Sequence, residues 1–215
     1  MGTEFGILLV TAATIGVVHT ILGPDHYIPF VALARARGWS AGRALRWTLF
    51  CGVGHVLGSM ALGVIGIALG LGVSHIEAIE GTRGELAAWL LITLGTLYMV
   101  WGIHQAMRAH AHHHHNHSHS VNRTTTAWVL FIIFVLGPCE ALIPVLMYPA
   151  ATAGVFEVAA VTGVFAIATV LTMSFAVVLG LVGMQRLAIG RLERFAHALA
   201  GATILACGLA IQLGL

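Results

Sequence analysis

The sequence predicts an all-α integral membrane protein with six transmembrane helices. Of its 215 residues, 59% are hydrophobic and only 8% are charged, whereas soluble domains carry roughly 25% charged residues. Apolar stretches of about 20 residues, the length that crosses the hydrocarbon core of a bilayer, recur along the chain. The first begins beside Glu4 with no basic residues before it, so we expect a spanning helix there and not a cleaved signal.

Six apolar segments follow one another, at residues 5–34, 43–73, 86–108, 126–150, 155–184 and 192–213. Ser40 precedes the second segment and Thr124 to Thr126 open the fourth, where their hydroxyl groups can cap a helix. Four of the segments exceed the length of one crossing, so tilt, kinks or interruptions must absorb the excess. We therefore divide the chain into a first membrane unit, 1–108, a loop, 109–123, and a second membrane unit, 124–215.

Charged residues are distributed unevenly between the links that join these segments. The chain has ten arginines and no lysine, and nine of the arginines lie in or beside three alternate links. Glu77, Glu80 and Glu85 share a link of the other set. Because positive residues remain on the cytoplasmic side, we expect both termini outside the cell and the loop 109–123 in the cytoplasm. The expected membrane is the plasma membrane of a prokaryote.

Two short stretches repeat one pattern, LGPDHYIP at residues 22–29 and LGPCEALIP at residues 136–144. Each unit contains three spans, so the second copy would be inserted upside down, as in the inverted repeats of many secondary transporters. Proline removes a backbone donor, and lipid tolerates such a break only where the backbone is buried in protein or lines a cavity. We expect a 3+3 inverted repeat in which broken helices 1 and 4 meet at a central site.

Side chains that bind metals gather at these breaks and in the second span. Cys51 and His55 are four residues apart and share one helix face. His19 and His26 are seven apart and would share a face on an unbroken helix, and the Gly-Pro break can still leave both pointing inward. Imidazole, thiolate and carboxylate together favour a divalent transition metal over Mg²⁺ or Ca²⁺. Hydrogen bonding between helices would be the plainer role of the histidines, as packing would be for Cys51. The candidate ligands are His19, Asp25, His26, His55, Cys51, Cys139 and Glu140.

Seven of the ten residues from 110 to 119 are histidines. Such tracts bind transition metals loosely, although a solvated linker is the simpler interpretation. We expect metal capture in this loop by His110, His112, His113, His114, His115, His117 and His119.

The chain resembles the nickel/cobalt transporter superfamily, which includes permeases, urease-accessory-type proteins and efflux proteins. The resemblance lies in His19 with Asp25-His26, in Gly54-His55 and in Pro138-Cys139. It implies a secondary transporter, not an enzyme, that moves nickel or cobalt, with zinc or iron as other cargoes and export favoured over import. The ion would bind between the broken helices. Permeases carry an Asp-Thr-Ala-Thr-Glu-type element where this chain has Cys139-Glu140.

Two alternatives stay open at this point. Thiol–disulfide electron carriers of the cytochrome-biogenesis type also have inverted three-span repeats, each with a Pro-Cys pair, whereas this chain has Pro24-Asp25 in the first repeat. A dithiol shuttle would need Cys51 beside Cys139. An intramembrane metallohydrolase would use Asp25, His26 and His55 as zinc ligands with Glu140 as base, but the sequence has no His-Glu-x-x-His helix.

The expected partners are membrane lipid, the metal ion and a cytoplasmic protein that delivers or accepts metal. We expect no organic cofactor and no nucleic acid, and the sequence does not predict the oligomeric state.

Overall fold

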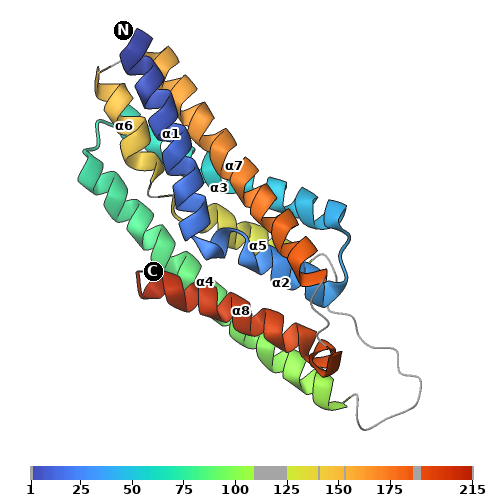
Figure 1. Ribbon diagram of the computed structural model, residues 1–215. Helices are drawn as coiled ribbons and strands as arrows, with labels where there is room; N and C mark the ends of the chain where they lie inside the picture. The colour runs from blue at the N-terminus through green and yellow to red at the C-terminus, as the bar shows by residue number, and fades with distance from the viewer. Residues whose placement is uncertain (1, 109–124, 140, 153, 186–189, 215) are drawn as a thin grey trace.

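The computed structural model describes residues 2–108, 125–139, 141–152, 154–185 and 190–214. All regular elements in these residues are helical (Figure 1), as the all-α prediction requires. They are α1 (Gly2–Leu22), the 3-10 helix η1 (Pro24–His26), α2 (Ile28–Arg37), α3 (Ala41–Ala68), α4 (Val73–Arg108), α5 (Thr125–Leu136), α6 (Leu142–Thr152), α7 (Val155–Gln185), the 3-10 helix η2 (Gly190–Phe195) and α8 (Ala196–Gln212).

Five helices of the described chain are long and apolar enough to cross a membrane, namely α1, α3, α4, α7 and α8. An integral membrane protein is therefore the correct class. The expected fourth span is not one long helix: the segment 126–150, in which we predict a broken helix, is divided between α5 and α6, of 12 and 11 residues. The segment 5–34 is likewise divided between α1 and α2.

The helix that we expected at 86–108 begins earlier, at Val73. Buried positions along its first part, including Ile76, Glu80, Gly84 and Ala87, recur every three or four residues, as on one face of a helix. The acidic stretch is therefore part of α4 and not a loop. At about 1.5 Å per residue this helix is longer than the bilayer core is thick.

Both Gly-Pro stretches interrupt a helix. The N–H of Gly23 donates to the carbonyl of His19 (3.0 Å), after which Pro24 offers no N–H and the chain turns through η1 into α2. In the second half, the N–H of Gly137 donates to the carbonyl of Ile133 (2.8 Å), and α6 begins at Leu142. Local sequence therefore ends both helices, since proline removes the donor that the next turn needs.

The turn from α2 to α3 follows the expected capping chemistry. Gly38 ends α2 with φ of 60°, a left-handed conformation that suits glycine. The hydroxyl oxygen of Ser40 accepts a hydrogen bond from the N–H of Arg43 (3.4 Å), so the predicted cap of α3 is confirmed. Thr124 lies outside the described residues, and α5 begins at Thr125.

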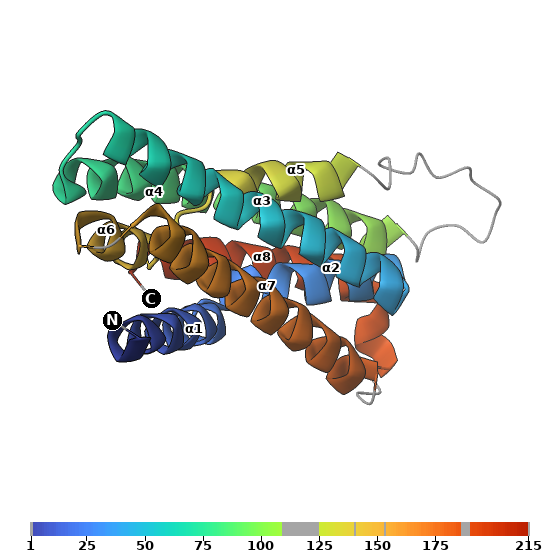
Figure 2. The same ribbon diagram turned by 90° about the horizontal axis from the view of Figure 1, so that it is seen from above.

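Helices α4 and α8 lie side by side along much of their length (Figures 1 and 2). Glycines allow this approach: a Cβ atom on Gly95 would collide with the backbone of Leu205, and one on Gly201 with the backbone of Met99. Small residues bring membrane helices into backbone contact in this way. Elsewhere α1 packs on α7, α5 packs on α3, and α2 packs on α7 and α8.

Candidate functional site

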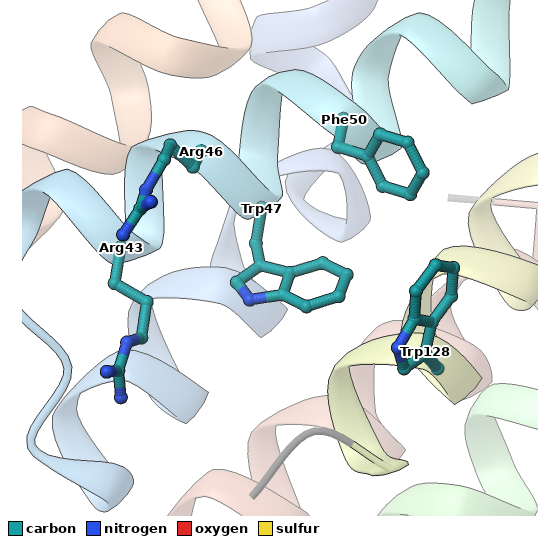
Figure 3. Close-up of a pocket in the computed structure, with 5 residues that line it drawn as sticks. All are labelled: Arg43, Arg46, Trp47, Phe50 and Trp128. Carbon is teal, nitrogen blue, oxygen red and sulfur yellow. The ribbon is translucent and has the colours of Figure 1, made fainter.

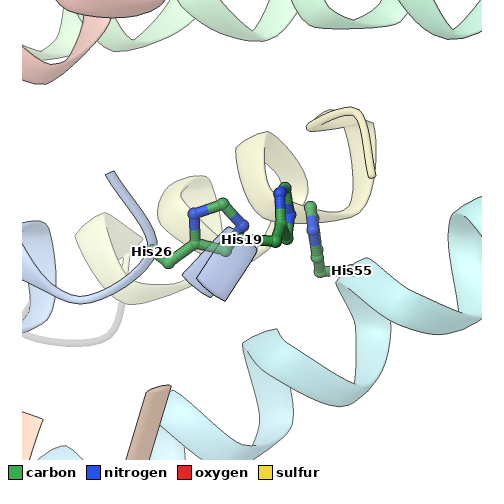
Figure 4. A group of neighbouring side chains, drawn as sticks. All are labelled: His19, His26 and His55. Carbon is green, nitrogen blue, oxygen red and sulfur yellow. The ribbon is translucent and has the colours of Figure 1, made fainter. Parts of the chain in front are cut away.

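Three imidazoles from three different segments meet where the first helix breaks. His19 is in the last turn of α1, His26 is in η1, and His55 is in α3. One nitrogen atom from each ring lies within 4.8 Å of the others. Ring centroids are 4.8 Å apart for His19 and His26 and 5.1 Å apart for His26 and His55. Figure 4 shows the side chains converging, and we call these three residues the histidine triad.

Hydrogen bonds fix which ring nitrogens face inward. Nδ1 of His26 lies 3.0 Å from the carbonyl of Gly23 and 3.2 Å from Oδ1 of Asp25. Nδ1 of His55 lies 3.1 Å from the carbonyl of Phe134. Because a carbonyl only accepts, Nδ1 of each ring carries the hydrogen and Nε2 presents a lone pair. Both Nε2 atoms are buried without a hydrogen-bond partner among the described residues.

The second helix break reaches the same place. Sγ of Cys139 lies 3.8 Å from Nε2 of His19, and the Cys139 side chain is fully buried. A cavity of about 20 Å³ borders His26 and His55, and its lining includes Asp25 from the first break and Pro138 from the second. This volume is that of about one water molecule. The two breaks thus come together at a small buried site.

The remaining predicted ligands have other positions. Asp25 hydrogen-bonds His26 and is not one of the three residues whose possible ligand atoms lie within 4.8 Å of one another. Cys51 is fully buried in the apolar cluster that contains Met173, whereas Cys139 belongs to a separate cluster with Phe165. All three cysteines are free. Glu140 and the histidines of the loop 110–119 lie outside the described residues.

A buried polar network supports the second break, and its residues are not among the predicted ligands. The carboxylate of Glu80, fully buried, accepts hydrogen bonds from the N–H of Cys139 (3.2 Å) and the hydroxyl of Ser59 (3.3 Å). Arg83 pairs with Glu80 and donates to the carbonyl of Val135 (2.7 Å). The i,i+3 spacing of Glu80 and Arg83 predicts an ion pair if the stretch is helical. We expected a loop there, and so this pair was missed.

A separate groove of about 370 Å³ lies between α3 and α5, lined by Arg43, Arg46, Trp47, Phe50 and Trp128 (Figure 3). Its aromatic rings pack on one another, with 5.6 Å between the centroids of Trp47 and Trp128. Tryptophan and arginine together are typical of the membrane–water boundary. This groove contains no nucleophile and is not part of the buried site.

Comparison with known proteins overturns the expected nickel/cobalt transporter. The family model of the cytochrome C biogenesis protein transmembrane region matches residues 28–210, and this is a family of thiol–disulfide electron carriers. The motifs that suggested nickel and cobalt are short, and His19 and His26 precede the matched range. Neither the curated proteins nor the solved structures include a match.

The match covers most of the chain, from the start of α2 to the last turns of α8. It includes His55, the Pro138-Cys139 pair and the network around Glu80. The chain therefore belongs to the family of cytochrome C biogenesis protein transmembrane regions.

Proposed function

We propose that this protein is a membrane thiol–disulfide carrier in which Cys139 alone is the reactive thiol. The position of Cys139 carries the proposal: it lies at a helix break, fully buried, with Sγ 3.8 Å from Nε2 of His19. A thiol becomes a nucleophile when a neighbouring base takes its proton. His19 is that base, and its half-buried ring lies beside both the thiol and the ring of His26.

A single thiol restricts the substrates. Cys51 packs in a different apolar cluster from Cys139, and Pro24 is followed by Asp25 where a paired carrier would have cysteine. Without a second protein thiol, Cys139 must form its disulfide with a substrate sulfur, and a substrate thiol must also resolve that disulfide. Because Cys139 is buried among helices, the proposed substrates are low-molecular-weight disulfides and thiols and not folded proteins.

The exchange balances without another cofactor. On one side of the membrane, the Cys139 sulfur attacks a small disulfide, RSSR. An S–S bond forms between Cys139 and RS, the original S–S bond breaks, and the second sulfur leaves as RSH with the proton from Cys139. On the other side, a thiol RSH attacks this mixed disulfide, RSSR is released, and its proton returns to Cys139. Each cycle moves two electrons in the direction opposite to the RS group.

Helix packing supports a 3+3 inverted repeat as the basis of such two-sided access. If α1 to α4 correspond in order to α5 to α8, the contacts of the two halves match: α1 packs on α7 as α5 packs on α3, and α2 packs on α8 as α6 packs on α4. The pairs α3·α7 and α4·α8 then relate corresponding helices. Inverted repeats allow a central site to open alternately to either side.

Arginine distribution supports an orientation with both termini outside the cytoplasm. Arg43 and Arg46, both exposed, lie beside Trp47 and Trp128 at the start of α3. This groove suits the lipid headgroup region on the cytoplasmic side, and the apolar exteriors of the long helices suit the hydrocarbon.

Proteoliposomes test the proposal directly. Vesicles containing cysteine would be diluted into cystine with a chelator present, and released thiol outside and cystine formed inside would be measured. Wild-type protein should couple both reactions. Cys139→Ser should abolish them, whereas Cys207→Ser, a matched buried cysteine on α8, should retain them.

Cys51→Ser separates one thiol from two. Retained transfer in this variant supports the single-thiol carrier. Loss of transfer in both Cys51→Ser and Cys139→Ser would overturn it in favour of a dithiol pair. Transfer by Cys139→Ser at the wild-type rate would overturn the assignment of the reactive thiol.

A further inference from the structure

We propose that the histidine triad, with Cys139 as fourth ligand, reversibly binds a divalent transition metal ion of the zinc type. This inference rests on the ring geometry and does not depend on the thiol-carrier function. The three nitrogen atoms come from segments that the fold alone brings together, and they lie within 4.8 Å of one another.

Two unsatisfied nitrogens are the main evidence. Nε2 of His26 and Nε2 of His55 are buried without a hydrogen-bond partner among the described residues, and each residue is 4% exposed. Burial of an unpaired polar group is energetically unfavourable. A metal ion between the rings would use both lone pairs and remove this cost.

The outer hydrogen bonds are those of metal-ligating histidines. Such histidines generally donate their second ring nitrogen to a carboxylate or a backbone carbonyl, which fixes the tautomer and the ring orientation. His26 has both partners, Asp25 Oδ1 and the Gly23 carbonyl, and His55 has the Phe134 carbonyl. Nδ1 is therefore occupied in both residues, and Nε2 is left to bind the ion.

The fourth ligand comes from the second helix break. Cys139 Sγ lies 3.8 Å from His19 Nε2, so a metal ion between the triad nitrogens would lie within reach of the sulfur. Zinc binds imidazole at about 2.0–2.1 Å and thiolate at about 2.3 Å in a tetrahedron, which requires nitrogens roughly 3.3 Å apart. From a separation of up to 4.8 Å, the nitrogens must therefore approach one another by at most about 1.5 Å around the ion.

The ligand set defines the class of ion. Three neutral imidazoles and one thiolate suit zinc or copper and exclude Mg²⁺ and Ca²⁺, which prefer oxygen. Charge is also balanced, because the Cys139 thiolate and the nearby Asp25 carboxylate together offset a divalent ion. A buried divalent charge without such groups would be strongly disfavoured.

The experiment uses the full-length protein with the seven histidines from 110 to 119 replaced by serine, because that tract binds metals itself. Purified, metal-free protein would be titrated with Zn²⁺ by calorimetry and with Co²⁺ by absorption spectroscopy. We expect one ion per chain and a tetrahedral cobalt spectrum with a sulfur-to-metal charge-transfer band.

Variants assign the ligands. His26→Ala and His55→Ala should each weaken zinc binding at least 100-fold, while His104→Ala, an exposed histidine of α4, should leave it unchanged. If the variants at the buried histidines fail to fold, His19→Asn provides a second test, because His19 is less buried and asparagine keeps a small polar group there. This variant should also weaken zinc binding. Cys139→Ser should lose the charge-transfer band and retain cobalt binding through the three imidazoles.

Wild-type zinc affinity in His26→Ala, or no bound ion in the folded loop-substituted protein, would overturn the metal site. The carrier proposal is tested separately, because cystine exchange is measured with a chelator present. The metal titration requires no thiol exchange, so either proposal can fail while the other holds. Retention of the charge-transfer band in Cys139→Ser would overturn the choice of fourth ligand.

Discussion

The N–H of Cys139 donates a hydrogen bond to the buried carboxylate of Glu80, with 3.2 Å between nitrogen and oxygen. The two residues are 59 positions apart in the chain, so the second helix break is positioned by α4 and not only by its own turn. Arg83 reinforces this contact, because it pairs with Glu80 and donates to the carbonyl of Val135 at the end of α5. Backbone groups that the break leaves without helical partners are thereby satisfied.

Glu80→Ala should strongly destabilise the protein. The substitution leaves the mostly buried guanidinium of Arg83 without its carboxylate and the Cys139 N–H without an acceptor, a loss of about 3 kcal/mol for a broken buried pair. Thermal and chemical unfolding in detergent would measure this change. Glu85→Ala is the matched control, since Glu85 is exposed one turn further along α4. Equal unfolding transitions in the two variants would contradict a structural role for Glu80.

Asp25→Asn should weaken zinc binding by about 10- to 100-fold without changing the stoichiometry, because outer-shell carboxylates commonly contribute this much. The asparagine still fits beside Nδ1 of His26, but it carries no charge to raise the basicity of the ring. Calorimetric titration of the loop-substituted protein would provide the affinity. An unchanged affinity would mean that the Gly23 carbonyl alone orients His26.

Zinc should inhibit cystine exchange reversibly. A bound ion would hold the Cys139 sulfur as a ligand and keep it from attacking a disulfide. Stoichiometric zinc should therefore slow exchange by at least tenfold, and a chelator should restore it. His55→Ala should make exchange insensitive to zinc, since it removes a metal ligand and keeps both Cys139 and His19. Full exchange by zinc-saturated wild-type protein would show that the thiol is not a ligand.

Gly201→Leu should disrupt the packing of α4 against α8. Any Cβ at this position collides with the backbone of Met99, so the helices must separate or the protein must fail to fold. The expected result is loss of the monodisperse peak in size-exclusion chromatography and a large decrease in thermal stability. Gly163→Ala is the control, because a Cβ there meets no atom within 4 Å; it should be tolerated.

Composition and hydropathy were sufficient to predict the all-α membrane class, since few charged residues and long apolar runs leave few other folds. The same information misplaced helix boundaries. Acidic residues in the first part of α4 were assigned to a loop because charges rarely enter membrane helices. Glu80 is nevertheless buried in α4, where Arg83 neutralises it and Ser59 donates a hydrogen bond to it. Such pairing depends on tertiary contacts that hydropathy does not record.

The site was predictable in part. Spacing placed His19 and His26 on one face, and their proximity to His55 depended on α3 packing beside the break, which spacing does not specify. Cys51 lies one helical turn from His55 along α3 and yet packs in the apolar core. The nickel/cobalt interpretation was wrong because histidine motifs of a few residues carry less information than a match over residues 28–210.

The glycine contact between α4 and α8 also limits how the protein can move. Where two backbones touch with no side chains between them, sliding by even a fraction of a helical turn brings main-chain atoms into collision. These two helices must therefore move together as one rigid unit. Any opening that exposes Cys139 to one side of the membrane or the other has to come from the remaining helices tilting against α4 and α8. A crosslink between α4 and α8 should therefore leave cystine exchange unchanged, whereas one between α1 and α7 should abolish it.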